Sequence, residues 1–331
     1  MTTTPGAPPT LRTRVVHGLR IGFLVLILVA VGLALWSNWE EVRGDLGRLG
    51  PGTLAAAAVL ALLSPFFTVL GWRVLLADLG SRLHIAEASG VFFVGQLGKY
   101  LPGSVWSVIV QTEMAVKLGV PRSRTAVVGL LCIGFSALTA LIAGLPSLPV
   151  LLTRGDTVLP WWGVLLIVGV LLVLLWPPLL NLGIRTALRL LRRPPLEHAL
   201  SHAAVGLSSL WFTLSWVVGG LSVWVMARAL APAGADPSQL VIVAVAGYLL
   251  AAGIGMFSIV VPAGVGVRDG VMLLLLTTAM PLSAATAVVV VARFLTVLGD
   301  VVWAAFGWLW AKSHHLLPER SRGRDPERVR T

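Results

Sequence analysis

Long apolar stretches alternate with short polar ones along most of the chain. Six of these stretches are long enough to cross a bilayer as helices, at about 19–36, 53–77, 125–151, 160–182, 203–227 and 283–311. Two further apolar regions, 88–118 and 239–280, are interrupted by glycine and proline. The pattern predicts an all-α polytopic membrane protein with about six full transmembrane helices and two broken or re-entrant helical hairpins.

Glycines and a proline interrupt the first hairpin region at residues 95–106, which read GQLGKYLPGSVW. Pro102 lacks a backbone N–H, and Gly98 and Gly103 let the chain turn, so we expect a helix to end here. The apolar arms on either side are too short to cross a bilayer core of about 30 Å. Lipid cannot hydrogen-bond the freed backbone groups, so the break must lie inside protein or beside a water-filled cavity. The stretch therefore predicts a polar site within the membrane.

The second hairpin region has a comparable break at residues 258–270, which read SIVVPAGVGVRDG. Pro262 and Pro281 repeat the spacing of Pro102 and Pro121 at an offset of 160 residues. Three spans separate the two regions, so the second copy would enter the membrane from the opposite side. We therefore predict an inverted repeat, a pattern that marks midplane binding sites in transporters. Chance similarity in a chain rich in Ala, Val and Leu is the alternative.

Charged side chains inside the membrane cost about 2.5–3.5 kcal/mol at the centre of a helix, so they generally line cavities or pair with one another. Lys99 in the first break and Arg268 in the second are suited to binding a lipid phosphate. Snorkelling of Lys99 to the interface and a salt bridge from Arg268 to a carboxylate are the alternatives. Gln96, Tyr100 and Trp106 could contact a headgroup, whereas exposure at a loop tip, or core packing for Trp106, would also explain them.

Further candidates follow from the breaks and from the remaining intramembrane charges. The helix breaks are assigned to Gly98, Pro102, Gly103, Pro262, Gly264 and Gly266. Charge partners or a proton path are assigned to Glu113, Asp269, Arg293 and Asp300. An internal ion pair between Arg293 and Asp300, and a superficial position for Glu113 near Lys117, are the simpler alternatives.

Composition agrees with a membrane protein, because 57% of the residues are hydrophobic and 12% are charged. The formal net charge of +11 matters here through its distribution, and we expect no nucleic-acid binding. With the N-terminus in the cytoplasm, the outside loops would carry only Arg43, Arg48, Arg154 and Arg228. The positive-inside rule then predicts that both termini are cytoplasmic.

The polar ends of the chain set the domain boundaries. We predict a disordered cytoplasmic tail at 1–15, a transmembrane domain at 16–312 and a basic cytoplasmic tail at 313–331. Within the membrane domain, the repeat units are predicted at about 85–151 and 239–311.

Catalytic and metal-binding signatures are missing from the sequence. It contains neither an HExxH pattern nor a P-loop, and Cys132 is its only cysteine. We therefore expect no catalytic residue, no metal and no cofactor, and we expect a transporter and not an enzyme.

The two breaks resemble motifs of a known family. GQLGKYLPGSVW is similar to a GKYxPG-like stretch, and PAGVGVRDG at 262–270 to a PGGxGxREG-like stretch, of the lysylphosphatidylglycerol synthase transmembrane (flippase-like) family. This family includes the membrane domain of the multiple peptide resistance factor. The likeness covers about residues 15–312. Ala263 and Asp269 depart from the glycine and the glutamate that are common in the family.

This resemblance implies movement of lipids between the leaflets of the bacterial cell (inner) membrane. The family-like residues are Lys99, Pro102, Gly103, Arg268 and Asp269. The resemblance favours a lipid translocase, acting as a flippase or scramblase on a phosphate-bearing phospholipid or polyprenyl-linked lipid. No soluble aminoacyl transferase domain follows the membrane region, so synthesis of lysyl-lipid is not expected and a separate lipid-synthesising enzyme is a candidate partner.

Two other functions remain open at this stage. One is a non-transporting accessory subunit of an envelope lipid or glycan assembly enzyme. The other is an intramembrane lipid-modifying enzyme that uses Glu113 or Asp269 as a base. The sequence predicts no oligomeric state.

Overall fold

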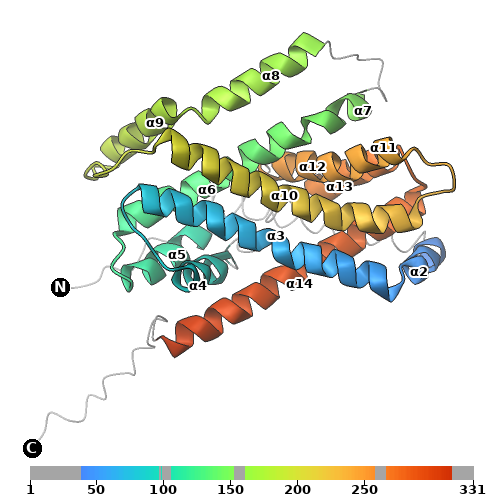
Figure 1. Cartoon of the computed structure of the whole chain (residues 1–331), viewed down its shortest axis with the longest axis horizontal. Coiled ribbons are helices and arrows are strands. Elements are labelled where there is room, and N and C mark those ends of the chain that lie inside the picture. Colours follow the sequence, from blue (N-terminus) through green and yellow to red (C-terminus); the bar gives the residue numbers. More distant parts are fainter. Residues whose placement is uncertain (1–38, 97, 99–105, 153–160, 258–265, 315–331) are drawn as a thin grey trace, which may run out of the picture.

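A computed structural model describes residues 39–96, 98, 106–152, 161–257 and 266–314. Within these ranges every regular element is a helix, and most helices run along one long axis to form a bundle (Figure 1). The predicted first span at 19–36 and nearly all of both predicted tails lie outside the described residues. The helical architecture confirms the predicted all-α polytopic membrane fold.

Four long apolar helices form the body of the bundle: α3 (Pro51–Asp78), α6 (Arg122–Gly144), α10 (His202–Leu230) and α14 (Leu282–Ser313). The 28 residues of α3 extend about 42 Å, which exceeds the thickness of a bilayer core. Pro51 opens α3 at a position where a missing N–H costs nothing. Ser201 caps α10, because its hydroxyl accepts a hydrogen bond from the Ala204 amide at 3.1 Å.

Two helical hairpins enter the bundle from opposite ends (Figure 1). The first consists of α4 (Ile85–Gln96) and α5 (Trp106–Val116), and the second of α12 (Gly247–Met256) and α13 (Val267–Leu276). The 12 residues of α4 extend about 18 Å, roughly half of the bilayer core, so the first hairpin is re-entrant in length.

The second hairpin has a longer first arm than the first hairpin. Helix α11 (Pro237–Val241) and the π-helical turn η3 (Ile242–Ala246) precede α12, and together the three segments make 20 helical residues that could span a membrane alone. The π-helical turn lies where the backbone of Val245 approaches Gly220 of α10. The two hairpins therefore share a break but differ in the depth to which the first arm reaches.

The helix boundaries repeat at the offset that the sequence predicts. Helix α4 ends at Gln96 and α12 at Met256, whereas α5 ends at Val116 and α13 at Leu276. The spans that follow, α6 and α14, begin 160 residues apart in the same register. Three independent boundaries thus agree with the prediction of an inverted repeat of broken hairpins.

The two repeat units pack reciprocally, since α4 lies against α14 and α12 lies against α6. Glycines permit both contacts. Gly90 of α4 faces the ring of Trp310, and a Cβ at Gly144 in α6 would lie 2.7 Å from the Cα of Leu250 in α12. Each hairpin is therefore held mainly by a span that belongs to the other unit.

The predicted span at 160–182 differs from the structure. It is divided into α8 (Trp161–Leu174) and α9 (Pro177–Leu190), which meet at an angle of 53°. Pro177 and Pro178 cause the break, because each removes a helical N–H donor and its ring clashes with the preceding turn. The remaining short helices are α2 (Trp39–Arg48), η2 (Leu145–Ser147) and α7 (Leu148–Leu152).

Hydroxyl groups join α3 to α10 along their length. Ser64 donates to the carbonyl of Ser215 at 2.8 Å, and Ser215 donates back to the carbonyl of Ser64 at 2.7 Å. Ser222 donates to the carbonyl of Ala57 at 2.8 Å in the same interface. These bonds satisfy the hydroxyl protons and hold the helix pair close together.

Candidate functional site

The structure describes only part of the predicted site. The following residues lie outside the described part of the chain: Lys99, Tyr100, Pro102, Gly103, Pro262 and Gly264. Their predicted roles remain predictions. The described candidates fall into three places, which are the arms of the first hairpin, the beginning of α13 and the middle of α14.

The arms of the first hairpin approach each other closely. Gly98 is buried, and a Cβ at this position would lie 2.5 Å from the amide nitrogen of Ser107, so a larger residue would separate the arms. Gln96 is half-buried at the end of α4, whereas Trp106 at the beginning of α5 is 46% exposed. The exposed ring of Trp106 is accessible to a lipid or headgroup from outside the bundle.

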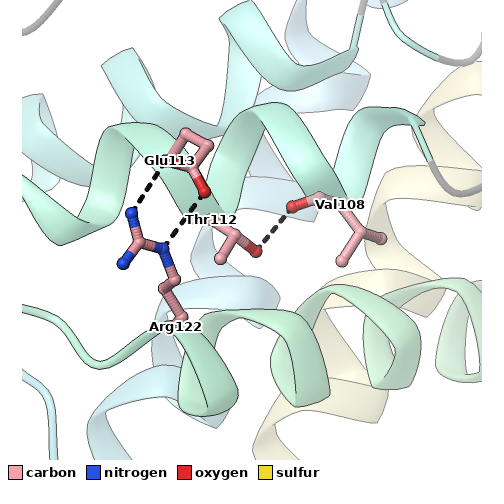
Figure 2. Close-up of polar contacts among 4 residues, drawn as sticks. All are labelled: Val108, Thr112, Glu113 and Arg122. Carbon is pink, nitrogen blue, oxygen red and sulfur yellow. Dashed lines mark hydrogen bonds and ion pairs between the residues drawn. The ribbon is translucent and has the colours of Figure 1, made fainter. Parts of the chain in front are cut away.

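Glu113 lies at the surface, in the last turn of α5. Its carboxylate accepts two hydrogen bonds from the Arg122 guanidinium, both at 3.1 Å (Figure 2). In the preceding turn, the Thr112 hydroxyl donates to the Val108 carbonyl at 2.7 Å. Glu113 therefore lies at the surface, which is the simpler of the two alternatives given by the sequence. Its partner is Arg122.

Arg268 occupies the first turn of α13. Gly266 precedes this helix with a φ of +85°, a backbone conformation that glycine adopts without strain. The Asp269 carboxylate accepts a hydrogen bond from the Gly266 amide at 3.2 Å, which caps the helix. The guanidinium of Arg268 lies 4.6 Å from the centre of the Tyr248 ring on α12, a cation–π contact. The Arg268 side chain therefore adds its positive charge to the positive N-terminal end of the α13 helix dipole.

A polar cavity of about 40 Å³ lies beside this pair, among α3, α10, α12 and α14. Tyr248 lines it, so the aromatic ring connects Arg268 to the cavity. Asp300 of α14 also lines it and is 8% exposed. Arg293 is half-buried on the same helix and does not line the cavity.

Four residues that line this cavity are not among those predicted from the sequence: Ser64, Ser222, Tyr248 and Thr296. A signal was present, because each is a polar residue in an otherwise apolar helix, and Pro65 interrupts the backbone bonding of α3 next to Ser64. Such residues inside membrane helices mark helix contacts or pathways. The sequence alone did not reveal that they face one another.

Basic residues are distributed unequally between the two ends of the bundle. The ends of α3, α5, α9 and α14 and the beginnings of α4 and α6 lie at the end where the first hairpin enters (Figure 1). The basic residues in or next to these helix ends are Arg82, Lys117, Arg122, Arg124, Arg185, Arg189, Arg192, Arg193 and Lys312. At the opposite end, in the described part of the chain, α2 and the last turn of α10 contain Arg43, Arg48 and Arg228. This is the asymmetry that a cytoplasmic and an external end of a membrane protein show.

A comparison with protein families matches residues 22–304 to the lysylphosphatidylglycerol synthase TM region. The chain belongs to this family. The matched segment contains both hairpins, Arg268 and the polar cavity. A search of curated proteins finds no match. Membership of this transmembrane family agrees with the apolar helices and indicates a multi-pass membrane protein with a lipid-related function.

The described geometry suits an anion next to Arg268. A guanidinium at the N-terminal turn of a helix offers fork-shaped donors together with the positive end of the helix dipole. The guanidinium of Arg268 lies over the ring of Tyr248. A phosphate could therefore bind at the beginning of α13, beside the half-buried Arg268.

Proposed function

We propose that the protein is a lipid translocase, a flippase or scramblase, that moves a phosphate-bearing lipid between the leaflets of a bacterial inner membrane. The headgroup phosphate would bind at Arg268 while the acyl chains remain in the bilayer. Lys99 of the first hairpin is the second proposed ligand. Alternating exposure of this site to either leaflet would move the headgroup across.

The observation that carries this proposal is the position of Arg268. It stands at the beginning of a 10-residue helix that enters from one end of the bundle, opposite a hairpin that enters from the other end (Figure 1). Half-length helices whose N-termini point at an anionic group are the binding elements of many transporters. Family membership supports a lipid as the substrate.

We further infer that the end of the bundle entered by the first hairpin faces the cytoplasm. Its excess of arginine and lysine supports this orientation, which gives cytoplasmic N- and C-termini.

The direct test is exchange of headgroup-labelled phospholipids between the leaflets of proteoliposomes that contain the purified full chain. We expect Arg268→Ala to lower the exchange rate about 10-fold or more, because a hydrogen bond to a charged group contributes about 1.5–3 kcal/mol. We expect Arg268→Lys to retain part of the rate, since lysine keeps the charge but loses the fork.

Arg228→Ala is the matched control. Arg228 also stacks on an aromatic ring, that of Trp224 at 5.6 Å, but it is exposed near the end of α10. Its removal should leave the exchange rate unchanged. No exchange by the wild type with anionic, zwitterionic or polyprenyl-phosphate lipids would refute the translocase and favour an accessory subunit.

A further inference from the structure

Helix α9 combines a buried apolar side with an exposed side that is both basic and apolar. Leu180 and Ile184 pack against the hydrophobic core of the bundle, and Leu188 is 5% exposed. Leu182 and Leu190 lie on the exposed side, where their exposed fractions are 56% and 79%. Large apolar side chains exposed beside arginines are typical of helices that lie at a membrane interface.

The basic part of this exposed side consists of four arginines within nine residues: Arg185, Arg189, Arg192 and Arg193. All four are exposed, and none of them forms a salt bridge with another described residue. The sequence has no Asp or Glu between Asp156 and Glu197, and Glu197 pairs with Arg124. The end of α9 and the turn after it therefore carry four positive charges and no negative one.

The turn that ends α9 has arginine at a position where glycine is usual. Arg192 has a φ of +53°, and it is the only residue other than glycine with a positive φ in the described part of the chain. Its amide donates to the Arg189 carbonyl at 3.0 Å, and the Arg193 amide donates to the Leu188 carbonyl at 2.8 Å. This is the hydrogen-bond pattern of a helix end that glycine normally occupies. A side chain in this conformation lowers stability, so it indicates a functional reason for the arginine.

The bend before α9 brings the arginines to the boundary of the bilayer core. Helix α8 extends about 21 Å from Trp161, and the exposed ring of Trp162 suits the headgroup layer at the boundary where α8 begins. With α8 along the bilayer normal, about 9 Å of a core of about 30 Å remains. Because α9 is inclined to α8 by 53°, its 14 residues advance about 13 Å in depth. The end of α9 therefore leaves the hydrocarbon and lies among the headgroups.

We propose that the end of α9 and the turn after it form a binding site for the phosphate groups of anionic phospholipids, in the leaflet at this end of the bundle. The exposed leucines lie against acyl chains while the four arginines bind phosphates. Clusters of four or more basic residues on an amphipathic helix attract anionic lipids, and guanidinium groups bind phosphate oxygens in pairs. This site is separate from the one proposed at Arg268 and does not require the protein to move lipid.

A lipid bound at this site would stabilise the connection from α9 to α10. The Asn181 side chain donates to the Leu200 carbonyl at 2.9 Å and accepts from the Leu200 amide at 2.8 Å. The next residue, Ser201, caps α10, and its amide donates to the Asp78 carboxylate of α3 at 2.7 Å. Because α9 is joined to two spans in this way, lipid binding should raise the unfolding temperature of the whole bundle.

The experiment measures the thermal unfolding midpoint of the purified full chain in a neutral detergent. Phosphatidylglycerol or phosphatidylcholine is added in equal molar amounts at constant ionic strength. We expect the midpoint in phosphatidylglycerol to be about 2 °C or more above that in phosphatidylcholine, because a ligand that binds only the folded state stabilises it. Raising NaCl from about 50 to about 500 mM should at least halve this difference, since salt screens exposed charges.

Two double variants locate the site. Arg185→Gln with Arg189→Gln, and Arg192→Gly with Arg193→Gln, should each reduce the rise in phosphatidylglycerol by half or more. The second double variant also removes the strain of the positive φ, so its midpoint in phosphatidylcholine should equal or exceed that of the wild type. A purely structural role for these arginines would instead lower the midpoint in both lipids.

Two controls separate this site from other positive charges. Arg43→Gln with Arg228→Gln removes two exposed arginines at the opposite end of the bundle and should keep the full rise. Arg268→Ala removes the proposed substrate ligand and should keep more than half of the rise.

The outcomes distinguish this inference from the proposed function. Loss of the rise in Arg268→Ala, with the rise kept in the α9 variants, would assign lipid binding to the proposed substrate site and overturn the inference. Equal wild-type midpoints in the two lipids, or a control pair at Arg43 and Arg228 that loses the rise as fully as the α9 variants, would also overturn it. A dimer that the α9 variants dissociate equally in both lipids would assign this surface to a second copy of the chain. A full α9-dependent response without any lipid exchange would retain the site and reject the translocase.

Discussion

At the residue scale, Gly144 shows how closely the two repeat units approach. The helix α6 meets the backbone of α12 at this position, where a Cβ would lie 2.7 Å from the Cα of Leu250. We predict that Gly144→Ala lowers the free energy of unfolding by about 1–3 kcal/mol, because two backbones must move apart. Gly134→Ala in the same helix has no atom within 4 Å of the new methyl and should be neutral or stabilising by up to about 1 kcal/mol. Thermal unfolding in detergent measures both.

Arg124 is a second residue whose importance the sequence did not reveal. In the sequence it is a basic residue at the edge of an apolar stretch, where exposure is expected, but it is buried at the beginning of α6. It donates to the Gly80 carbonyl at 2.9 Å and to the Ser81 hydroxyl at 2.6 Å, and it pairs with Glu197 at 3.2 Å. These bonds join the loop after α3 and the loop before α10 to the beginning of α6.

We therefore predict that Arg124→Ala costs about 1.5–3 kcal/mol of folding free energy, since hydrogen bonds to a charged donor are lost in a buried place. Arg122→Ala, two residues away, removes an ion pair whose side chains are 64% and 55% exposed. This control should change stability by less than about 1 kcal/mol. Equal losses in the two variants, measured by thermal unfolding, would contradict the structural role of Arg124.

At the element scale, each hairpin should have both of its flanking residues on the same side of the membrane. In a Cys132→Ala background, the single variants Arg82→Cys and Lys117→Cys place a cysteine on either side of the first hairpin. Ser238→Cys and Pro281→Cys do the same for the second hairpin. We expect the first pair to react with a membrane-impermeant maleimide from the cytoplasmic side only, and the second pair from the opposite side only. Labelling of the cysteines at positions 82 and 117 from different sides would mean that this segment crosses the membrane once, and it would contradict a hairpin that returns to its starting side.

The long spans were predictable from the sequence, whereas the bend between α8 and α9 was not. Long uninterrupted apolar runs make α3 and α14 nearly coincide with the predicted spans. Pro177 and Pro178 lie inside such a run, so hydropathy alone counts the segment as one span although the prolines prevent a continuous helix. The apolar composition of a segment determines whether it can lie in the bilayer. The prolines within the segment determine whether its helix is continuous.

At the scale of the whole molecule, the contact between α4 and α14 joins the two repeat units. A Cβ at Gly307 would lie 3.3 Å from the Cβ of Phe93, close to the separation of about 3.5–4.5 Å that disulfides have. We predict that Phe93→Cys with Gly307→Cys, in the Cys132→Ala background, cross-links on oxidation. The cross-link should lower lipid exchange about 10-fold, because alternating access requires the units to move against each other.

A second cysteine pair controls for the cross-link itself. A Cβ at Gly129 would also lie 3.3 Å from the Cβ of Val108, but both residues belong to the first repeat unit. Val108→Cys with Gly129→Cys should cross-link without lowering exchange, and a reductant should restore exchange in the first pair. Full exchange with the first cross-link in place would show that the α4–α14 contact does not change during transport.

The charged residues of the candidate site could be singled out from the sequence, whereas the cavity could not. Arg268 and Asp300 were found because a charge in an apolar run is conspicuous in any sequence. The cavity that surrounds Asp300 was not found, because its lining comes from four helices that are far apart in the chain. Those helices meet only in the folded bundle, where α10 packs against α3, α12 and α14.

The same packing has a consequence for how a cell makes the protein. Helix α4 leaves the ribosome early, yet its main partner α14 begins only at Leu282. Until α14 is synthesised, the first hairpin must wait in the translocon or beside an insertase without the helix that packs most extensively against α4. Contacts between distant parts of a chain are slow to form and leave aggregation-prone intermediates. Nascent chains that stop before α14 should therefore be held by membrane chaperones or removed by membrane proteases.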